Sequence, residues 1–271
     1  MKYRTFYLNQ RQYDWLAINL PQPKPSGGRI PTPNRELLNG ILYVLKTGCR
    51  WQDIPGSVCV HNPSTCWRRF NYWRKQRSIV GVWQSILGNL SDSGALDLSV
   101  GNVDGSLVQS PKYKNGTGYS GKHHRIGTNV LLTTDKNGLP LSTHTMQGNR
   151  HDSSGAEKVI QKIRVGAKKR VKQMNGDKGF DSKKLRDNLR KRGIKANIPE
   201  RKFKHRRKKG RPPIYDKAKA KFRAFVERTF AWLKYFRRLR YRWERKKKMF
   251  QAFVDLGCLL LCLKRAEGLL Q

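Results

Sequence analysis

The chain has 271 residues, with 58 lysines and arginines against 18 aspartates and glutamates, and a formal net charge of +40 at pH 7. This excess of like charge is typical of a protein that binds a polyanion. The basic residues are spread along the chain among aromatic ones, which favours nucleic acid over a membrane surface. A hydrophobic share of 37% is enough for a packed core, so a disordered basic tail is excluded.

The first residues contain no apolar segment of the signal-peptide type. The longest apolar run, near Leu256 to Leu263, is too short to cross a bilayer. We therefore expect a cytoplasmic protein with no membrane partner.

Residues 1–90 are predicted to form a helical DNA-binding domain. The pattern predicts helices from Tyr13 to Leu20 and from Arg35 to Lys46, the second ending at Gly48. A third helix follows in the segment TCWRRFNYWRKQ, with Ser64 as its N-cap. Its basic residues, expected to contact DNA, are Arg68, Arg69 and Arg74. A helix, a tight turn and a basic helix outline a helix-turn-helix module; the alternative is a helical bundle that covers the catalytic core.

Residues 98–271 are predicted to form the catalytic domain. Strands are expected at Leu98 to Val103, Asn129 to Thr134 and Leu139 to Met146, with a hairpin turn at Asn137-Gly138. Alternating helices and strands follow, at Ser153 to Ile163, Arg170 to Asn175, Ser182 to Arg192 and Ile194 to Ile198. An antiparallel start that continues as helix and strand in alternation predicts an α/β fold, a ribonuclease H-like mixed sheet flanked by helices.

The C-terminal part begins with a basic loop at residues 201–211. A long helix from Asp216 to Arg238 and an apolar helix from Phe250 to Leu263 are expected after it. We expect DNA to bind the loop and the basic stretch from Lys234 to Lys248. The residues assigned to this contact are Arg206, Arg207, Lys208, Lys209, Arg237 and Arg238.

Three of the few acidic residues suggest a metal-dependent catalytic site. Asp104 and Asp177 are each placed at the end of a predicted strand, and Glu227 lies on the long helix. Two carboxylates from strand ends and one from a crossing helix can hold two divalent cations, which serve phosphoryl transfer. Oxygen ligands favour Mg²⁺, two ions in this case, with Mn²⁺ as a substitute.

The helix that carries Glu227 also places Arg223 and Lys234 on the same stripe, about 60° wide. This arrangement suits a metal ligand flanked by two cations that hold DNA phosphates; the alternative is an ordinary row of surface ion pairs. Asp152 and Asp181 are alternative metal ligands, although both are expected to cap the helices that follow them. Trp232 is predicted to be buried against the sheet.

Three segments resemble the acidic blocks of bacterial insertion-sequence transposases of the DDE superfamily, in the insertion-sequence 5 (insertion-sequence 4-like) family. They are Val103-Asp104-Gly105-Ser106, Gly176-Asp177-Lys178-Gly179-Phe180-Asp181 and Val226-Glu227-Arg228-Thr229-Phe230-Ala231-Trp232-Leu233-Lys234. The related signature of Tyr, Arg, Glu and Lys is matched at its last three positions, and Ala220 stands in place of its tyrosine. The segment Thr47-Gly48-Cys49-Arg50-Trp51 resembles the N-terminal part of the same family.

The resemblance implies a bacterial DNA transposase, which would be associated with the nucleoid. Such an enzyme would bind the inverted-repeat ends of its mobile element, cleave the terminal phosphodiesters and join the 3′-OH ends to target DNA, as a homodimer or larger oligomer on DNA. Asp104, Asp177 and Glu227 would hold the metals, and Arg223 and Lys234 would hold phosphates. Two other interpretations stay open: a nuclease of the same fold that does not transpose, and a DNA-binding protein without activity.

Overall fold

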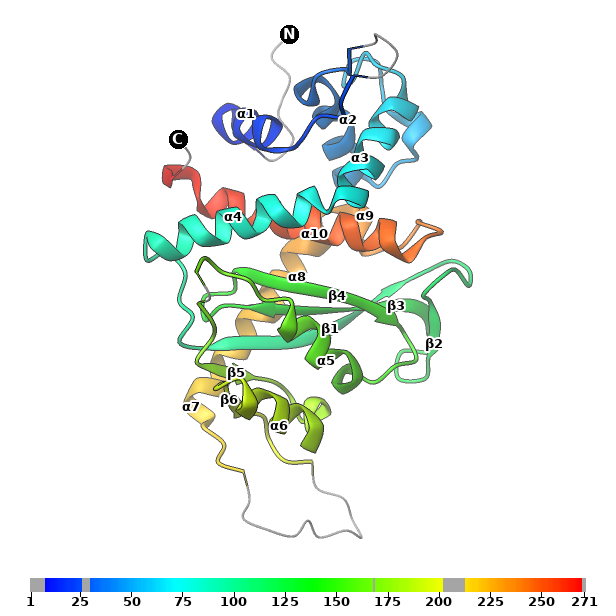
Figure 1. Ribbon diagram of the computed structural model, residues 1–271. Helices are drawn as coiled ribbons and strands as arrows, with labels where there is room; N and C mark the ends of the chain where they lie inside the picture. The colour runs from blue at the N-terminus through cyan, green and yellow to red at the C-terminus, as the bar shows by residue number, and fades with distance from the viewer. Residues whose placement is uncertain (1–7, 26–29, 168, 202–212, 270–271) are drawn as a thin grey trace.

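The helices of the N-terminal third lie at one end of an elongated molecule, and a mixed sheet lies in the middle (Figure 1). The computed structural model describes residues 8–25, 30–167, 169–201 and 213–269. Four of the loop residues assigned to DNA, namely Arg206, Arg207, Lys208 and Lys209, fall outside the described residues. No helix in the described ranges is both long enough and apolar enough to cross a membrane.

The first helices are α1 (Gln10–Asn19), α2 (Asn34–Thr47), α3 (Pro63–Gln76) and α4 (Ser78–Asp92). The helix α2 ends as predicted, because Gly48 adopts the left-handed conformation, with φ +75°. Ser64 does not cap α3; the side chain of Asn62 accepts a hydrogen bond from the Ser64 amide at 2.9 Å, with Pro63 at the first helical position. The link from α2 to α3 runs from Gly48 to Asn62 through a 3-10 turn (Trp51–Asp53), so it is longer than the tight turn that was predicted.

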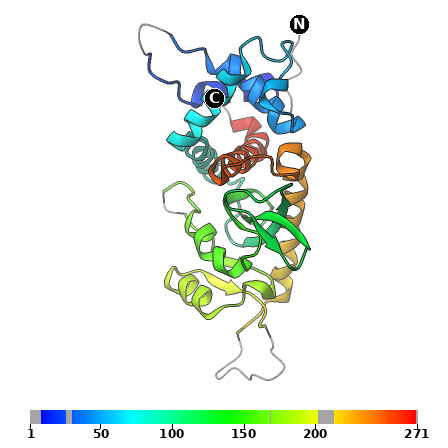
Figure 2. The same cartoon turned by 90° about the vertical axis from the view of Figure 1, so that its right-hand side faces the viewer.

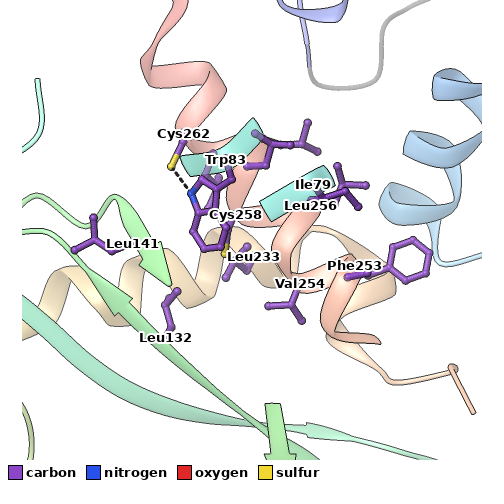
Figure 3. Packing of buried hydrophobic residues seen from close by; sticks show 14 of the residues in the cluster. Ile79, Trp83, Leu132, Leu141, Leu233, Phe253, Val254, Leu256, Cys258 and Cys262 are labelled. Carbon is purple, nitrogen blue, oxygen red and sulfur yellow. Dashed lines mark hydrogen bonds between the residues drawn. The ribbon is translucent and has the colours of Figure 1, made fainter. Parts of the chain in front are cut away.

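The C-terminal helix α10 (Lys247–Arg265) joins these helices to the sheet. Its buried residues cover nearly all sides of the helix, which requires neighbours all around it. It contacts α4, β4, α8 and α9, and the Trp83 indole on α4 donates to the Cys262 sulfur at 3.3 Å (Figure 3). One hydrophobic cluster therefore extends from α1 to the end of the chain.

The sheet has six strands, in the order β2-β3-β1-β5-β6, with β4 also paired to β3. They are β1 (Gly101–Gln109), β2 (Gly118–Ser120), β3 (Arg125–Thr134), β4 (Pro140–Gln147), β5 (Gln173–Asn175) and β6 (Lys195–Asn197). The strands β1 to β4 pair antiparallel, whereas β5 is parallel to β1 and β6 is parallel to β5. The predicted ribonuclease H-like fold is confirmed, and so is the hairpin, where Gly138 has φ +93°.

Helices cover both faces of the sheet (Figure 2). On one face lie α5 (Asp152–Gln161) and α6 (Lys183–Lys191), and on the other lies α8 (Ala224–Tyr235). The long helix predicted to reach Arg238 is interrupted: α7 (Lys217–Ala220) and a 3-10 turn (Lys221–Arg223) precede α8, and α9 (Arg237–Arg240) follows it. The break before α9 is at Phe236, whose backbone is extended and whose side chain is buried.

Candidate active site

The register of the sheet brings Asp104 and Asp177 together. In the parallel pair of β1 and β5, Asn102 lies opposite Asn175, and two residues further along each segment stand Asp104 and Asp177. The negative charge of Asp177 helps to raise the pKa of Asp104, as expected for two carboxylates on adjacent strands. The prediction that Asp104 ends its strand is wrong, because β1 continues to Gln109 in antiparallel pairing with β3.

Asp104 is partly buried, and burial is the main reason why its pKa is raised to about 6. The Gly105 amide, which donates to its Oδ1 at 2.8 Å, and the Arg223 guanidinium oppose this rise. The carboxylates of Asp177 and Asp152 add to it. A bound cation would relieve this repulsion, because it favours the ionised form of all three groups.

Asp152 lies close to this pair, on the face of the sheet that α5 covers. It is the first residue of α5 and hydrogen-bonds the Asn129 side chain, while His151 is the N-cap, so the predicted capping role of Asp152 is wrong. Burial and the charge of Asp177 raise its pKa. A Cβ atom at Gly105 would lie only 2.9 Å from Asp152 Oδ1, so the glycine leaves room for this carboxylate next to the strand that carries Asp104.

Asp181 lies in a different environment. Its Oδ1 pairs with Arg186 at 2.9 Å, and its Oδ2 accepts from the Arg201 amide at 2.8 Å. Ser182 caps α6 by accepting from the Leu185 amide at 3.2 Å, so the predicted capping role of Asp181 is also wrong. An aspartate already held by Arg186 is poorly suited to bind a metal.

Glu227 lies on the outer part of α8, where 60% of its side chain is exposed. It pairs with Arg223 at 3.4 Å, and Arg223 in turn lowers the pKa of Asp104. Within the described ranges, no three acidic, histidine or cysteine side chains are close enough to one another to hold a metal ion. The structure thus brings together Asp104 and Asp177 but does not bring Glu227 to them, and Glu227 pairs with Arg223 instead.

Arg223 and Lys234, the two cations of the predicted stripe, lie along the face of β1 that carries Asp104. Successive side chains of a strand alternate between its faces, so Asp104, Ser106 and Val108 share one face. Lys234 lines a small void together with Ser106 and Val108, while Arg223 acts on Asp104. Arg223 and Lys234 therefore flank Glu227 along this strand.

Two of the arginines assigned to DNA are structural. Arg69 is 5% exposed and donates to the Asn34 side chain and, at 2.7 Å, to the Thr32 carbonyl. Arg238 is 6% exposed; it pairs with Glu244 at 2.5 Å and donates to the carbonyls at the end of α2. Each guanidinium is enclosed by its partners, so neither side chain is placed to contact DNA in this structure.

Other predicted contacts remain at the surface. Arg68 and Arg237 are exposed, and Arg74 is half-buried with its guanidinium on the Asn71 side chain, at 2.8 and 3.0 Å. Trp232 was predicted to be buried but is 44% exposed, with the Arg228 guanidinium 5.0 Å from its ring centre. The exposure of Trp232 was not predicted, because the angular position of a residue on a helix does not show how wide the buried face of that helix is.

Residues 96–263 match the family described as "Transposase DDE domain". The chain belongs to this family. Residues 8–87 match a second description, "Putative transposase of IS4/5 family", so the resemblance read from the acidic blocks is confirmed. The matched range includes Asp104, Asp177 and Glu227.

Two proteins of Burkholderia cepacia are similar to this transposase-family chain. One, "Putative transposase for insertion sequence element IS402", is 36% identical over 152 residues, which are 53% of this chain and 67% of the relative. The other, "Insertion element IS402 uncharacterized 16.2 kDa protein", is 39% identical over 106 residues, 35% of this chain and 69% of the relative. A solved structure, "Mos1 transposase paired-end complex with left transposon end", covers 87% of this chain and 79% of its own at 10% identity; its TM-score of 0.25 is too low to support an argument.

Proposed function

We propose that this transposase-family protein binds the inverted-repeat ends of its own element, cleaves the terminal phosphodiesters and transfers the 3′-OH ends into target DNA. The observation that carries the proposal is the neighbouring pair Asp104 and Asp177, inside the region that matches the transposase DDE domain. A raised carboxyl pKa next to a second carboxylate is a common feature of functional sites.

The residues present fit divalent cations. Asp104 and Asp177 offer hard oxygen donors, and Asp152 adds its charge to theirs from the opposite face of β1. Asp104, Asp177 and Glu227 would hold Mg²⁺, with Mn²⁺ as a substitute. When bound, two such ions supply an activated nucleophile and charge stabilisation for the leaving oxygen of a phosphodiester.

Glu227 would reach this site by turning its side chain away from Arg223. Arg223 is the last residue of the 3-10 turn before α8, a rise of about 6 Å separates it from Glu227, and Arg223 already acts on Asp104. An exposed pair spaced by four residues contributes only about 0.3–0.5 kcal/mol. Leaving Arg223 therefore costs little, and the freed guanidinium would contact a phosphate beside the acidic pair.

Lys234 would hold the DNA further along the same strand, near Ser106 and Val108. Arg68 and Arg237 are exposed and would add contacts to the backbone. With a charge of +40, the chain would bind DNA with a strong dependence on salt. Because two element ends must be cut and joined together, we propose that two or more copies act on the DNA, at the bacterial nucleoid.

The test is a strand-transfer assay. The wild-type protein, Mg²⁺, a pre-cut element end and a supercoiled plasmid should give a joined product, which a nuclease that does not transpose would not give. Asp104→Ala, Asp177→Ala and Glu227→Ala should each abolish cleavage and joining while DNA affinity stays within about twofold. Asp92→Ala, which removes an exposed ion pair with Lys169, is the control.

Cleavage by all three active-site variants at the wild-type rate would refute the site. If the wild-type protein binds DNA but does not cleave it with any divalent cation, the protein is a DNA-binding protein without catalytic activity, and the proposed function is refuted.

A further inference from the structure

A cleft of about 1120 Å³ opens beside the edge strand β4, away from the acidic pair. Its walls come from the end of α3, from α4, from the end of α5 and from the start of α10, and both α5 and α10 contact β4. The strand β3 separates β4 from β1, so two strand spacings, about 10 Å, separate the cleft floor from the strand of Asp104. Six basic residues line it in addition to Arg74: Arg77, Lys158, Lys162, Arg164, Lys247 and Lys248.

The positive charges in this cleft repel one another. His144 on the floor has its pKa lowered to about 4 by burial and by the cations Lys162, Lys247 and Lys158. Loss of solvent and the charges of Arg77 and Lys247 lower the pKa of Lys162, although Asp255 opposes them. None of the six basic residues forms an ion pair within the part of the chain that the structure describes.

The lining contains a single carboxylate, that of Asp255. It is buried and accepts hydrogen bonds from Thr143 and Gln251, and burial raises its pKa to about 6. One buried carboxylate cannot balance six cations that come from three different segments. An anion from outside would do so, which makes the cleft electrostatically prepared for a polyanion.

The floor also carries an unused hydrogen-bonding group. The outer edge of β4 is otherwise satisfied: the Thr143 carbonyl accepts from Lys162 Nζ at 3.0 Å, and the Thr145 amide donates to Gln251 at 2.7 Å. Thr145 is 1% exposed and lines the cleft, yet its hydroxyl has no hydrogen-bond partner in the described structure. A buried hydroxyl of this kind is favourable only when a ligand oxygen or a water completes it.

Arg77 adds a backbone observation. It is the single residue between α3 and α4, and its φ of +57° lies in the left-handed region, where glycine or asparagine is favoured. An arginine stands there, with its side chain in the lining of the cleft. The backbone conformation does not explain why an arginine stands here, whereas a role for its positive charge in the cleft does.

We propose that this cleft binds the phosphodiester backbone of DNA, as a holding site separate from the acidic pair; the proposal rests on the proposed function, in which the protein acts on DNA. A free phosphate would need fewer cations at closer spacing, whereas charges spread over three segments match a repeating chain of phosphates. The contact would be independent of base sequence, because phosphate contacts position a duplex without reading it.

The first test compares two double variants of equal charge. Lys158→Gln with Lys248→Gln removes two exposed cations from the cleft, and Lys183→Gln with Lys191→Gln removes two exposed cations from α6. The binding of a random-sequence duplex is measured by fluorescence anisotropy over a range of salt concentrations. We expect the cleft variant to lose about tenfold in affinity at low salt, and about 1.8 in the slope of log K against log salt, since each contact contributes about 0.9. Equal behaviour of the two double variants would overturn the proposal.

Arg77→Gly separates charge from folding. It removes a cation and relieves the left-handed backbone, so we expect a melting temperature no lower than that of the wild type together with weaker DNA binding. Unchanged affinity in this variant would count against the cleft.

Lysine acetylation of the wild-type protein, read by mass spectrometry without added metal, needs no variant. DNA should protect Lys158 and Lys248 and leave Lys183 and Lys191 reactive. Equal protection by inorganic phosphate would reduce the cleft to a small-anion site, and protection at high protein concentration without DNA would make it a contact between copies; either result overturns the proposal. If the protein cleaves DNA while the cleft lysines stay reactive, the proposed transposase function stands and DNA binding in the cleft is refuted. If DNA protects these lysines but no cleavage occurs, DNA binding in the cleft stands and the proposed transposase function is refuted.

Discussion

Replacing Asp104 by asparagine should stabilise the protein at pH 8 while it abolishes DNA cleavage. Burial and the carboxylates of Asp177 and Asp152 raise the pKa of Asp104 from 3.8 to about 6. A carboxyl whose pKa is raised in the folded state holds its proton more tightly there than in the unfolded chain. The free energy of unfolding therefore decreases as pH rises from about 4 to 6, and above pH 6 the full penalty remains.

The size of this penalty follows from the shift. Two pKa units correspond to about 3 kcal/mol at roughly 1.4 kcal/mol per unit, and partial solvent access reduces this to the order of 1–3 kcal/mol. Asparagine keeps the shape and cannot ionise, so the variant should exceed the wild type by that amount at pH 8 and by almost nothing at pH 4.

The assay is urea unfolding of both proteins at several pH values. Asp53→Asn is the control, because that exposed carboxyl pairs with Arg50, which lowers its pKa, and it should give no gain at high pH. Mg²⁺ should stabilise the wild type at pH 8 and have little effect on Asp104→Asn. A stability difference between Asp104→Asn and the wild type that is constant with pH would refute the electrostatic description of the site.

Three further predictions concern stability. Arg238→Ala should cost about 3–5 kcal/mol in urea unfolding, because it leaves the buried partner carboxylate unpaired, whereas Arg237→Ala at the exposed neighbouring position should cost less than about 0.5 kcal/mol; similar losses would show that the pair is not buried. Arg69→Ala should cost about 2–3 kcal/mol by leaving buried acceptors unsatisfied, while Arg68→Ala should keep the stability and weaken DNA binding; a reversed result would place Arg69 at the surface. Gly48→Ala should lower the free energy of unfolding by about 1–2 kcal/mol, since φ is +75° and the new Cβ would lie 3.3 Å from the Arg237 backbone; an unchanged transition would contradict the left-handed helix end.

Local signals in the sequence predicted much of the fold. The Gly48 helix end and the Asn137-Gly138 turn depend on the conformations that neighbouring residues allow, and both are confirmed. The extent of β1 was missed because Gly105 suggested a turn. The structure instead continues the strand to Gln109, and the absent Cβ of Gly105 leaves room for Asp152.

Long-range packing decided what the sequence could not. Arg68 and Arg69 are adjacent and chemically identical, and the positions of the Thr32 carbonyl and the Asn34 side chain make one of them structural. Arg237 and Arg238 differ in the same way, through the buried Glu244. The acidic pair was foreseen as residue types, but the register between β1 and β5 is what makes Asp104 and Asp177 neighbours.

The position of the cations is the most direct test of the account. Crystals of the protein with an element end and Mn²⁺ should give two anomalous peaks, both contacted by Asp104 and Asp177 and one also by Glu227, with Arg223 released from Glu227. Peaks that avoid Asp104 and Asp177, or a Glu227 that still pairs with Arg223 while both ions are bound, would contradict a shared site for the three carboxylates.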